Sequence, residues 1–236
     1  MLRDGIFLLV IFLTNIIQGI TGFAGTVLAM PPSILLQGID VAMPILNLLG
    51  LFASVYIVAI SYKDLNKKEF VKVMVIMFFG LLAGIYIYSV LPVPVLLKIY
   101  AVFIILVALK GLFVKKEVEL NEWILNGIVF VAGIIHGMFV SGGPLLIIYA
   151  AQKFREKSEF RATVSAVWII LNSYLAFSHW QTGLFTSRTI TKLWWGIIPL
   201  LAGMVIGNIL HKKMSQKMFL LITYVLLIIS GLTLLI

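Results

Sequence analysis

The sequence alternates between long apolar stretches and short polar segments along its whole length. A helix that crosses the hydrocarbon core of a bilayer needs about 20 mostly apolar residues, and about eight of the stretches approach that length. The apolar segments are 5–21, 25–37, 41–61, 70–90, 94–114, 122–139, 143–152, 162–180, 191–210 and 216–235. This pattern predicts an all-α membrane protein with about eight spanning helices, in which 25–37 and 143–152 are short broken or re-entrant helices.

Glycine and proline interrupt the apolar pattern at the start of each short segment. The two interruptions are Gly19-Ile20-Thr21-Gly22-Phe23-Ala24-Gly25, which leads to Pro31-Pro32, and Gly133-Ile134-Ile135-His136-Gly137-Met138-Phe139, which leads to Ser141-Gly142-Gly143-Pro144. Unpaired backbone polar groups are too costly in lipid, so non-helical backbone at this depth must face protein or a water-filled cavity. Paired broken helices in the two halves of a transporter mark its substrate site, and we expect that site here.

The two interruptions lie in halves of the chain that are similar to each other. Leu81-Leu82-Ala83-Gly84 recurs 119 residues later as Leu200-Leu201-Ala202-Gly203, and the same offset relates Ser54 to Ser173. We therefore divide the chain into a first transmembrane repeat, 1–114, a linker, 115–121, and a second transmembrane repeat, 122–236. An odd number of segments in each repeat inverts the second repeat relative to the first, an arrangement found in many secondary transporters.

The distribution of charge indicates how the chain is oriented. It carries 18 Lys and Arg residues against 9 Asp and Glu residues, and most of the basic residues gather after the third, fifth, seventh and ninth segments. Basic residues accumulate in the cytoplasmic loops of membrane proteins, so we expect a lipid bilayer and not nucleic acid as the partner of this surface. With these clusters inside the cell, the N-terminus is extracytoplasmic and the 115–121 linker is cytoplasmic.

Acidic side chains are missing from the middle of every predicted helix, since all 9 lie in loops or near helix ends. A charge inside the membrane is expensive and usually functional, so this absence favours a neutral or anionic substrate over a cation. The N-terminus of a helix binds anions through free N–H groups and a partial positive charge. Alternatively, the glycines at the breaks only allow close helix packing. The candidate substrate contacts at the breaks are Thr21, Gly22, Gly25, Ser141, Gly142 and Gly143.

A few polar side chains within the apolar segments are further candidates. His136 lies inside the second break, where it is either a structural residue that donates to a carbonyl or a substrate contact that carries a coupling proton. Arg161 begins a helix and is either a snorkelling side chain or a contact for an anion at the cytoplasmic mouth. With no cysteine and three scattered histidines, we expect no metal site and no cofactor. The remaining candidates, which could equally form hydrogen bonds between helices, are Asn47, Ser54, Asn172 and Ser173.

These motifs resemble those of the sulfite exporter TauE/SafE family, a group of small prokaryotic membrane transporters. The resemblance covers nearly the whole chain and rests on residues 19–25 with Pro31, on residues 133–144, and on Glu159-Phe160-Arg161-Ala162-Thr163. It implies a multi-pass protein of the prokaryotic inner membrane that moves a small sulfur-containing anion, such as sulfite or an organosulfonate. Export is the direction usually associated with the family.

The combined features predict a secondary transporter that works by alternating access, and not an enzyme. The chain has no P-loop motif for ATP hydrolysis, so we expect a proton gradient to drive transport and His136 to carry the proton. A passive channel for small anions is the alternative, because channels also contain inverted repeats and glycine breaks. An intramembrane enzyme would need a nucleophile–base pair or a metal, and the sequence offers only an isolated histidine. The sequence indicates no particular oligomeric state.

Overall fold

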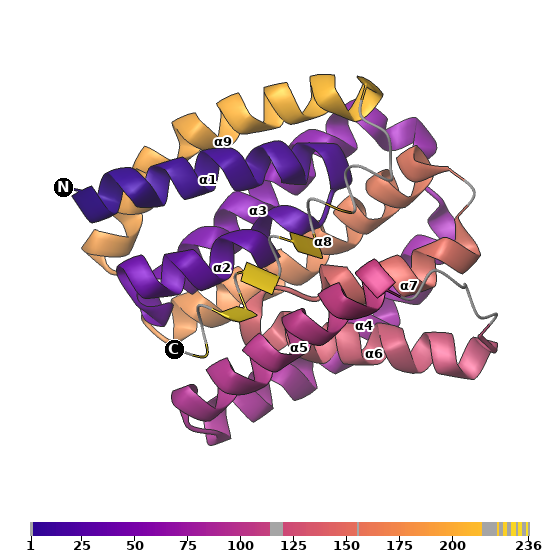
Figure 1. Ribbon diagram of the computed structural model, residues 1–236, viewed down its shortest axis with the longest axis horizontal. Coiled ribbons are helices and arrows are strands. Elements are labelled where there is room, and N and C mark those ends of the chain that lie inside the picture. Colours follow the sequence, from indigo (N-terminus) through magenta and orange to yellow (C-terminus); the bar gives the residue numbers. More distant parts are fainter. Residues whose placement is uncertain are drawn as a thin grey trace.

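The computed structural model describes residues 2–113, 120–154 and 156–213, and a few positions between 221 and 235. The helices in these ranges are α1 (Leu2–Thr21), α2 (Ala24–Gln37), α3 (Ile39–Ser61), η1 (Tyr62–Asp64), α4 (Lys67–Val90), α5 (Val93–Phe113), α6 (Glu122–Phe139), α7 (Gly143–Lys153), α8 (Lys157–Gln181) and α9 (Ser187–Lys213). Figure 1 shows that they form an elongated bundle. Seven of them, α1, α3, α4, α5, α6, α8 and α9, are long and apolar enough to cross a membrane. The prediction of an all-α membrane protein is confirmed.

The two short helices have the lengths that the apolar pattern indicates. α2 has 14 residues and α7 has 11, which is too few to cross the hydrocarbon core. Pro31 lies inside α2 and cannot donate to the Val27 carbonyl four residues earlier. The Tyr100 hydroxyl of α5 lies 3.4 Å from that oxygen and replaces the missing donor. Most of the tenth predicted segment, 216–235, and most of the 115–121 linker lie outside the described residues.

α1 and α6, the first helices of the two predicted repeats, begin at opposite ends of the bundle (Figure 1). Near the end of α1, the Ile20 carbonyl lies 2.7 Å from Nδ1 of His211 in α9, and Lys157 at the start of α8 donates to the His211 carbonyl at 2.9 Å. α1 and α9 therefore end where α8 begins. Asn66, directly before α4, donates to Glu159 at the start of α8 at 2.7 Å, and Lys72 in the second turn of α4 pairs with Glu122 at the start of α6, so α6 begins at this same end. The two first helices consequently run in opposite directions.

Two helix pairs, α1 with α9 and α4 with α6, cross through matching glycine contacts. A Cβ atom built on Gly84 of α4 would lie 2.2 Å from a carbonyl oxygen of α6, and one built on Gly207 of α9 would lie 2.3 Å from a carbonyl oxygen of α1. Helix backbones approach this closely only where a side chain is absent. The matching contacts are Gly84 with Ile134 and Gly207 with Ile16, and one turn earlier Gly80 with Phe130 and Gly203 with Phe12.

These contacts correct the register that the sequence offset of 119 predicts. Ile16 and Ile134 are 118 residues apart, whereas Gly84 and Gly207 are 123 residues apart. The structural counterpart of Gly84 is therefore Gly207 and not Gly203. The two candidates are one helical turn apart, so both face the same side of the helix. Sequence similarity in Leu-rich helices cannot distinguish them.

Replacing Gly133 by Ala should destabilise the α4–α6 pair. The added Cβ would lie 2.4 Å from the Met77 carbonyl oxygen, so the helices must move apart at a cost of about 1–3 kcal/mol. Gly127 lies in the same helix with no atom within 4 Å of such a Cβ, which makes Gly127→Ala the matched control. We expect a lower midpoint of thermal unfolding in detergent for Gly133→Ala only. Equal midpoints for the two variants would contradict the close packing.

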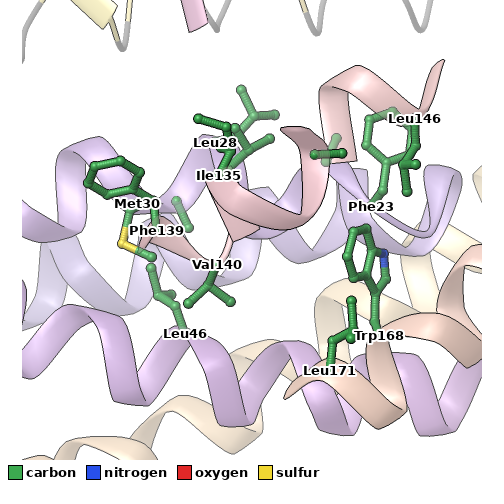
Figure 2. Packing of buried hydrophobic residues seen from close by; sticks show 14 of the residues in the cluster. Phe23, Leu28, Met30, Leu46, Ile135, Phe139, Val140, Leu146, Trp168 and Leu171 are labelled. Atoms are coloured by element: carbon green, nitrogen blue, oxygen red, sulfur yellow. The ribbon is translucent and has the colours of Figure 1, made fainter. Parts of the chain in front are cut away.

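The non-helical backbone of both breaks is buried in the core of the bundle. Phe23 of the first break is 7% exposed, and Val140 and Ser141 of the second break are each 2% exposed. Figure 2 shows Phe23 beside Trp168 of α8, and Val140 in the middle of the buried cluster. The Tyr100 ring stacks on Phe139 with the ring centroids 4.4 Å apart. The breaks therefore face protein, as their predicted depth in the membrane requires.

Candidate functional site

Both breaks begin with a residue in the left-handed backbone conformation. Gly22 follows α1 with φ 84°, and Val140 follows α6 with φ 55°. The two positions are 118 residues apart, the same offset that relates the contacts of α1 and α6. This conformation costs an L-residue roughly 1–2 kcal/mol, which glycine avoids at Gly22. Val140 is held in it by burial and by a 2.8 Å hydrogen bond from its N–H to the His136 carbonyl.

A small cavity lies between the two breaks. Its volume of about 10 Å³ is close to the minimum that one water molecule needs. The first break, the second break and four of the long helices all contribute to its wall. The lining residues are Gln18, Phe23, Thr26, Gly50, Ser54, His136, Val140, Gly143, Trp168 and Asn172. The structure therefore brings together His136, Gly143, Ser54 and Asn172, which the sequence placed in one site.

Equivalent positions of the two repeats line the cavity in pairs. Gln18 and His136 are 118 residues apart, and so are Ser54 and Asn172. The sequence offset of 119 instead pairs Ser54 with Ser173, and this expectation is wrong. Ser173 is exposed and its hydroxyl donates to the Ile169 carbonyl at 2.7 Å. One residue rotates a helical side chain by about 100°, which takes Ser173 away from the cavity.

His136 is almost completely buried in the cavity wall, with 2% of its surface exposed. Its Nε2 lies 2.9 Å from Asn172 Oδ1, and its ring stacks on Trp168 with the centroids 4.5 Å apart. Nδ1 has no hydrogen-bond partner among the described residues. The partner of His136 is thus a side chain of α8 and not a nearby backbone carbonyl. Among the residues that line the cavity, His136 is the one titratable side chain.

The donors at the start of α2 are occupied by the protein itself. Thr21 Oγ1 accepts from the N–H groups of Phe23 and Ala24 at 3.2 and 3.1 Å. Gln18 Oε1 accepts from the Gly25 N–H at 2.8 Å, and Gln18 Nε2 donates to the Gly22 carbonyl at 3.1 Å. Thr21 and Gln18 therefore cap α2, and the first break does not present the free donors that the sequence suggested.

The start of α7 is different. Its N-cap residue, Gly142, has no side chain, and no side chain in the described part of the chain accepts a hydrogen bond from the N–H groups of Gly143 or Leu145. Ser141 does not cap α7 either, because its hydroxyl donates to the Phe139 carbonyl at 2.8 Å and accepts from the Tyr100 hydroxyl at 2.8 Å. Gly143, one residue further, lies in the cavity wall. Of the two breaks, the second leaves its helix N-terminus without a side-chain cap.

The glycines of the breaks also allow close packing, the alternative role that the sequence left open. A Cβ on Gly25 would lie 2.5 Å from Gln18, one on Gly142 would lie 2.2 Å from the Ala132 carbonyl oxygen, and one on Gly143 would lie 2.7 Å from the Phe23 ring. These contacts bring the short helices directly against the long ones. Gly143 serves both purposes, since its missing side chain also leaves the cavity open.

Two other predicted residues lie outside the cavity wall. Asn47 is buried and its Nδ2 donates to the Asn172 carbonyl at 3.0 Å, so it joins α3 to α8. Arg161 is 4% exposed, which excludes a snorkelling side chain that reaches water. The wall also contains Thr26 and Gly50, which sequence reasoning did not single out as site residues. The offset of 118 additionally pairs Gln18 with His136, which the sequence alone did not relate.

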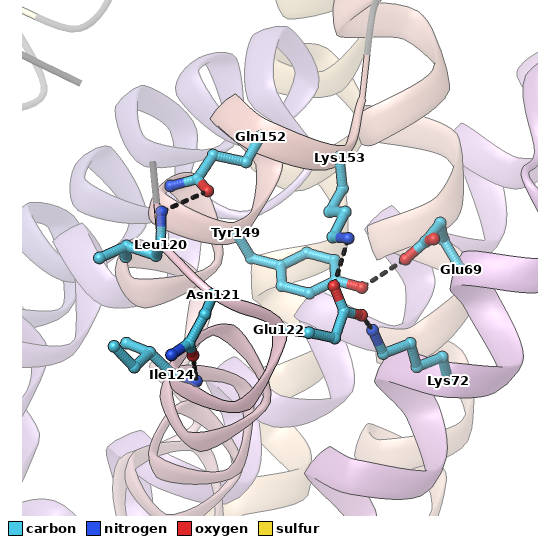
Figure 3. Close-up of polar contacts among 9 residues, drawn as sticks. All are labelled: Glu69, Lys72, Leu120, Asn121, Glu122, Ile124, Tyr149, Gln152 and Lys153. Atoms are coloured by element: carbon cyan, nitrogen blue, oxygen red, sulfur yellow. Dashed lines mark hydrogen bonds and ion pairs between the residues drawn. The ribbon is translucent and has the colours of Figure 1, made fainter. Parts of the chain in front are cut away.

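A polar cluster ties the end of each short helix to the start of two long ones. The α6 cluster is formed by Glu122 with Lys72 of α4 and Lys153 of α7, both of which pair with its carboxylate (Figure 3). The Tyr149 hydroxyl of α7 also donates to Glu69 of α4. The α1 cluster is its counterpart and is formed by Asp4 with Lys192 of α9 and Gln37 of α2. The Asp4 carboxylate pairs with Lys192 and accepts a hydrogen bond from Gln37 at 3.0 Å. Asp4 and Glu122 are again 118 residues apart.

Comparisons with known proteins identify the family. The family model described as "Sulfite exporter TauE/SafE" matches residues 7–234. The chain is also similar to a protein of Comamonas testosteroni described as "Probable inner membrane transporter protein TsaS", with 30% identity over 103 residues. That match covers 43% of this chain and 43% of the Comamonas protein, so the two correspond over less than half of their lengths. No solved structure matches the chain. Because the family match extends over almost its whole length, the chain belongs to the sulfite exporter TauE/SafE family.

Proposed function

We propose that this protein is an inner-membrane secondary transporter of a small anion, sulfite or an organosulfonate, and that the cavity between the two breaks is its substrate site. The family description and the name of the Comamonas relative support transport. The observation that carries the site is the cavity itself, which combines hydrogen-bonding side chains from both halves with an uncapped helix N-terminus. Such a helix end attracts an anion through its N–H groups and its dipole. The implied direction is export.

The paired contacts support two inverted repeats, 1–114 and 122–236. The glycine contact between α1 and α9 corresponds to the one between α6 and α4. The cavity-lining residues and the two polar clusters also correspond between the two halves. Antiparallel first helices are what an inverted repeat requires. In the predicted orientation, the N-terminus and the α1 cluster are extracytoplasmic, and the 115–121 linker and the α6 cluster are cytoplasmic.

The short helices are the parts that open the site in this proposal. The glycine contacts of α1 with α9 and of α4 with α6 join helices of different repeats, and such close packing resists sliding. Those pairs form the fixed frame. The clusters that hold the far ends of α2 and α7 are different, because the Asp4 and Glu122 side chains are 50% and 49% exposed. An exposed ion pair contributes about 0–1 kcal/mol, so each cluster can open and close. Alternating access follows if one opens while the other stays closed.

Flux measurements on purified protein in liposomes test the function. Sulfite and methanesulfonate should enter the liposomes saturably, and a pH difference should drive them above the external concentration, because the proposal couples their movement to protons through His136. Empty liposomes provide the baseline. Fast, non-saturable and purely downhill flux would instead support a passive anion channel. Transport of a cation with no flux of any small anion would overturn the proposal.

A further inference from the structure

Arg161 is a buried cation without an anionic partner. It lies in the second turn of α8, and its Nη2 donates to Asn208 Oδ1 of α9 at 3.2 Å, a neutral acceptor at the long end of the normal range. Its Nε has no hydrogen-bond partner among the described residues. Within that part of the chain, Arg161 is the one buried residue among all Lys, Arg, Asp and Glu side chains. A buried unpaired charge is strongly unfavourable, and a charge retained inside a membrane protein marks a functional site.

A second unpaired polar group lies one turn further along the same face of α8. Ser165 is 0% exposed, and its hydroxyl also has no partner in the described part of the chain. The first break passes directly over both residues, because a Cβ on Gly22 would lie 3.0 Å from Arg161 Cγ and 3.1 Å from Ser165 Oγ. The Gly22 carbonyl in turn accepts from Trp168 Nε1 at 3.1 Å. The two unpaired groups therefore adjoin the wall of the cavity.

We propose that Arg161 and Ser165 form a second anion site, which receives the sulfo group of the substrate before it reaches the cavity and which Asn208 partly occupies in its absence. The inference rests on the proposed function, because it names where the transported anion is loaded. A guanidinium presents Nε–H and Nη2–H side by side, which matches two oxygens of sulfite or of a sulfonate. The Ser165 hydroxyl supplies a further donor. In the present conformation Asn208 Oδ1 occupies one of the oxygen positions, and the anion displaces it.

This site has no counterpart in the first repeat. The residue 118 positions before Arg161 is Met43, an apolar side chain that is 3% exposed. The guanidinium therefore stands on one side of the cavity, at the end of the bundle where α8 begins. In the predicted orientation this end is cytoplasmic. An anion that enters from this end therefore meets the guanidinium before it reaches the cavity.

Substitutions of Asn208 test the site without removing Arg161. Asn208→Asp places a carboxylate on the guanidinium, and the dissociation constant for sulfite should rise at least about tenfold, because the charge that binds the anion is already neutralised. Asn208→Ala removes the competing acceptor and should lower the dissociation constant by about threefold. Both constants are measured by isothermal titration of purified protein with sodium sulfite and with sodium methanesulfonate. A merely structural contact predicts the opposite order, with Asn208→Ala the more damaging change.

A matched serine pair checks the second donor. Ser165→Ala should weaken sulfite binding by about threefold or more, whereas Ser173→Ala, on the exposed face of the same helix, should leave it unchanged. Unchanged sulfite binding by Asn208→Asp, or no binding by the wild type, would overturn this site. If the wild type binds sulfite in an Asn208-dependent manner but carries no anion across liposomes, the transport proposal fails and the site stands. If the wild type transports sulfite normally and Asn208→Asp has the same Michaelis constant, the second anion site fails and the transport proposal stands.

Discussion

Replacing His136 by Gln is expected to abolish the proton-driven accumulation of sulfite in liposomes. His136 is the titratable side chain of the cavity wall, and its Nδ1 is unpaired among the described residues. Protonation would add a positive charge and a second donor beside the anion. Because a hydrogen bond to a charged group contributes about 1.5–3 kcal/mol, its loss should weaken sulfite binding at acidic pH by about tenfold to a hundredfold. The measurements are uptake under an imposed pH difference and the pH dependence of sulfite affinity.

Glutamine is chosen because the structure already places Gln18 at the equivalent position of the first repeat. Its amide can still donate to Asn172, so the variant keeps the contact between α6 and α8. His179→Gln is the matched control. Like His136, His179 of α8 is buried and its Nδ1 is unpaired in the described part of the chain, but it does not line the cavity. Proton-driven uptake that survives in His136→Gln would show that the coupling proton travels elsewhere. Its loss in both variants would indicate a general defect in folding.

Cross-linking either short helix to its polar cluster should stop transport completely and reversibly. The chain contains no cysteine, so engineered pairs react without background. One pair, Asp4→Cys with Gln37→Cys, fastens α2 at the α1 cluster, and the other, Glu122→Cys with Lys153→Cys, fastens α7 at the α6 cluster. If each cluster must open once in every transport cycle, either link blocks the cycle. Flux is measured in liposomes after treatment with a short bifunctional thiosulfonate reagent, and again after its removal with a reductant.

Single-cysteine variants treated with the same reagent separate the effect of the link from the effect of the modification. They should keep most of their flux, because the exposed clusters contribute little to stability. A cross-linked pair that still transports at the normal rate would show that its short helix does not move. If only the α1 pair or only the α6 pair blocks flux, then alternating access through both short helices is wrong.

Much of the architecture could be predicted from the local pattern of apolar and polar residues. Spanning helices, the two short helices and the interruption around Gly22 depend on runs of neighbouring residues, and hydropathy and glycine mark them directly. The second break at His136 and Gly143 was predictable for the same reason. Those predictions survived because a bilayer forces each segment to satisfy its own backbone hydrogen bonds, which makes the local pattern decisive.

The assignment of individual residues to the site was less successful. Ser173 and Asn172 are adjacent in the sequence and both polar, yet only Asn172 reaches the cavity. Gly25 and Thr21 carry the residue types expected at an anion site, but their groups are used by Gln18 and by the first turn of α2. Which donor is occupied depends on the facing side chain. That partner comes from another turn or another helix, and composition does not specify it.

By itself, the sequence determined the membrane class, the positions of the two breaks and the absence of a central carboxylate, because each of these is a property of a contiguous segment in an apolar solvent. Only the tertiary structure decided the offset of 118, the glycine crossings that pair helices of different repeats, and the isolation of Arg161 from any carboxylate in the described chain. These features depend on the direction in which each helix face points and on what packs against it. A shift of one residue changes that direction by about 100° while leaving the apolar pattern nearly the same.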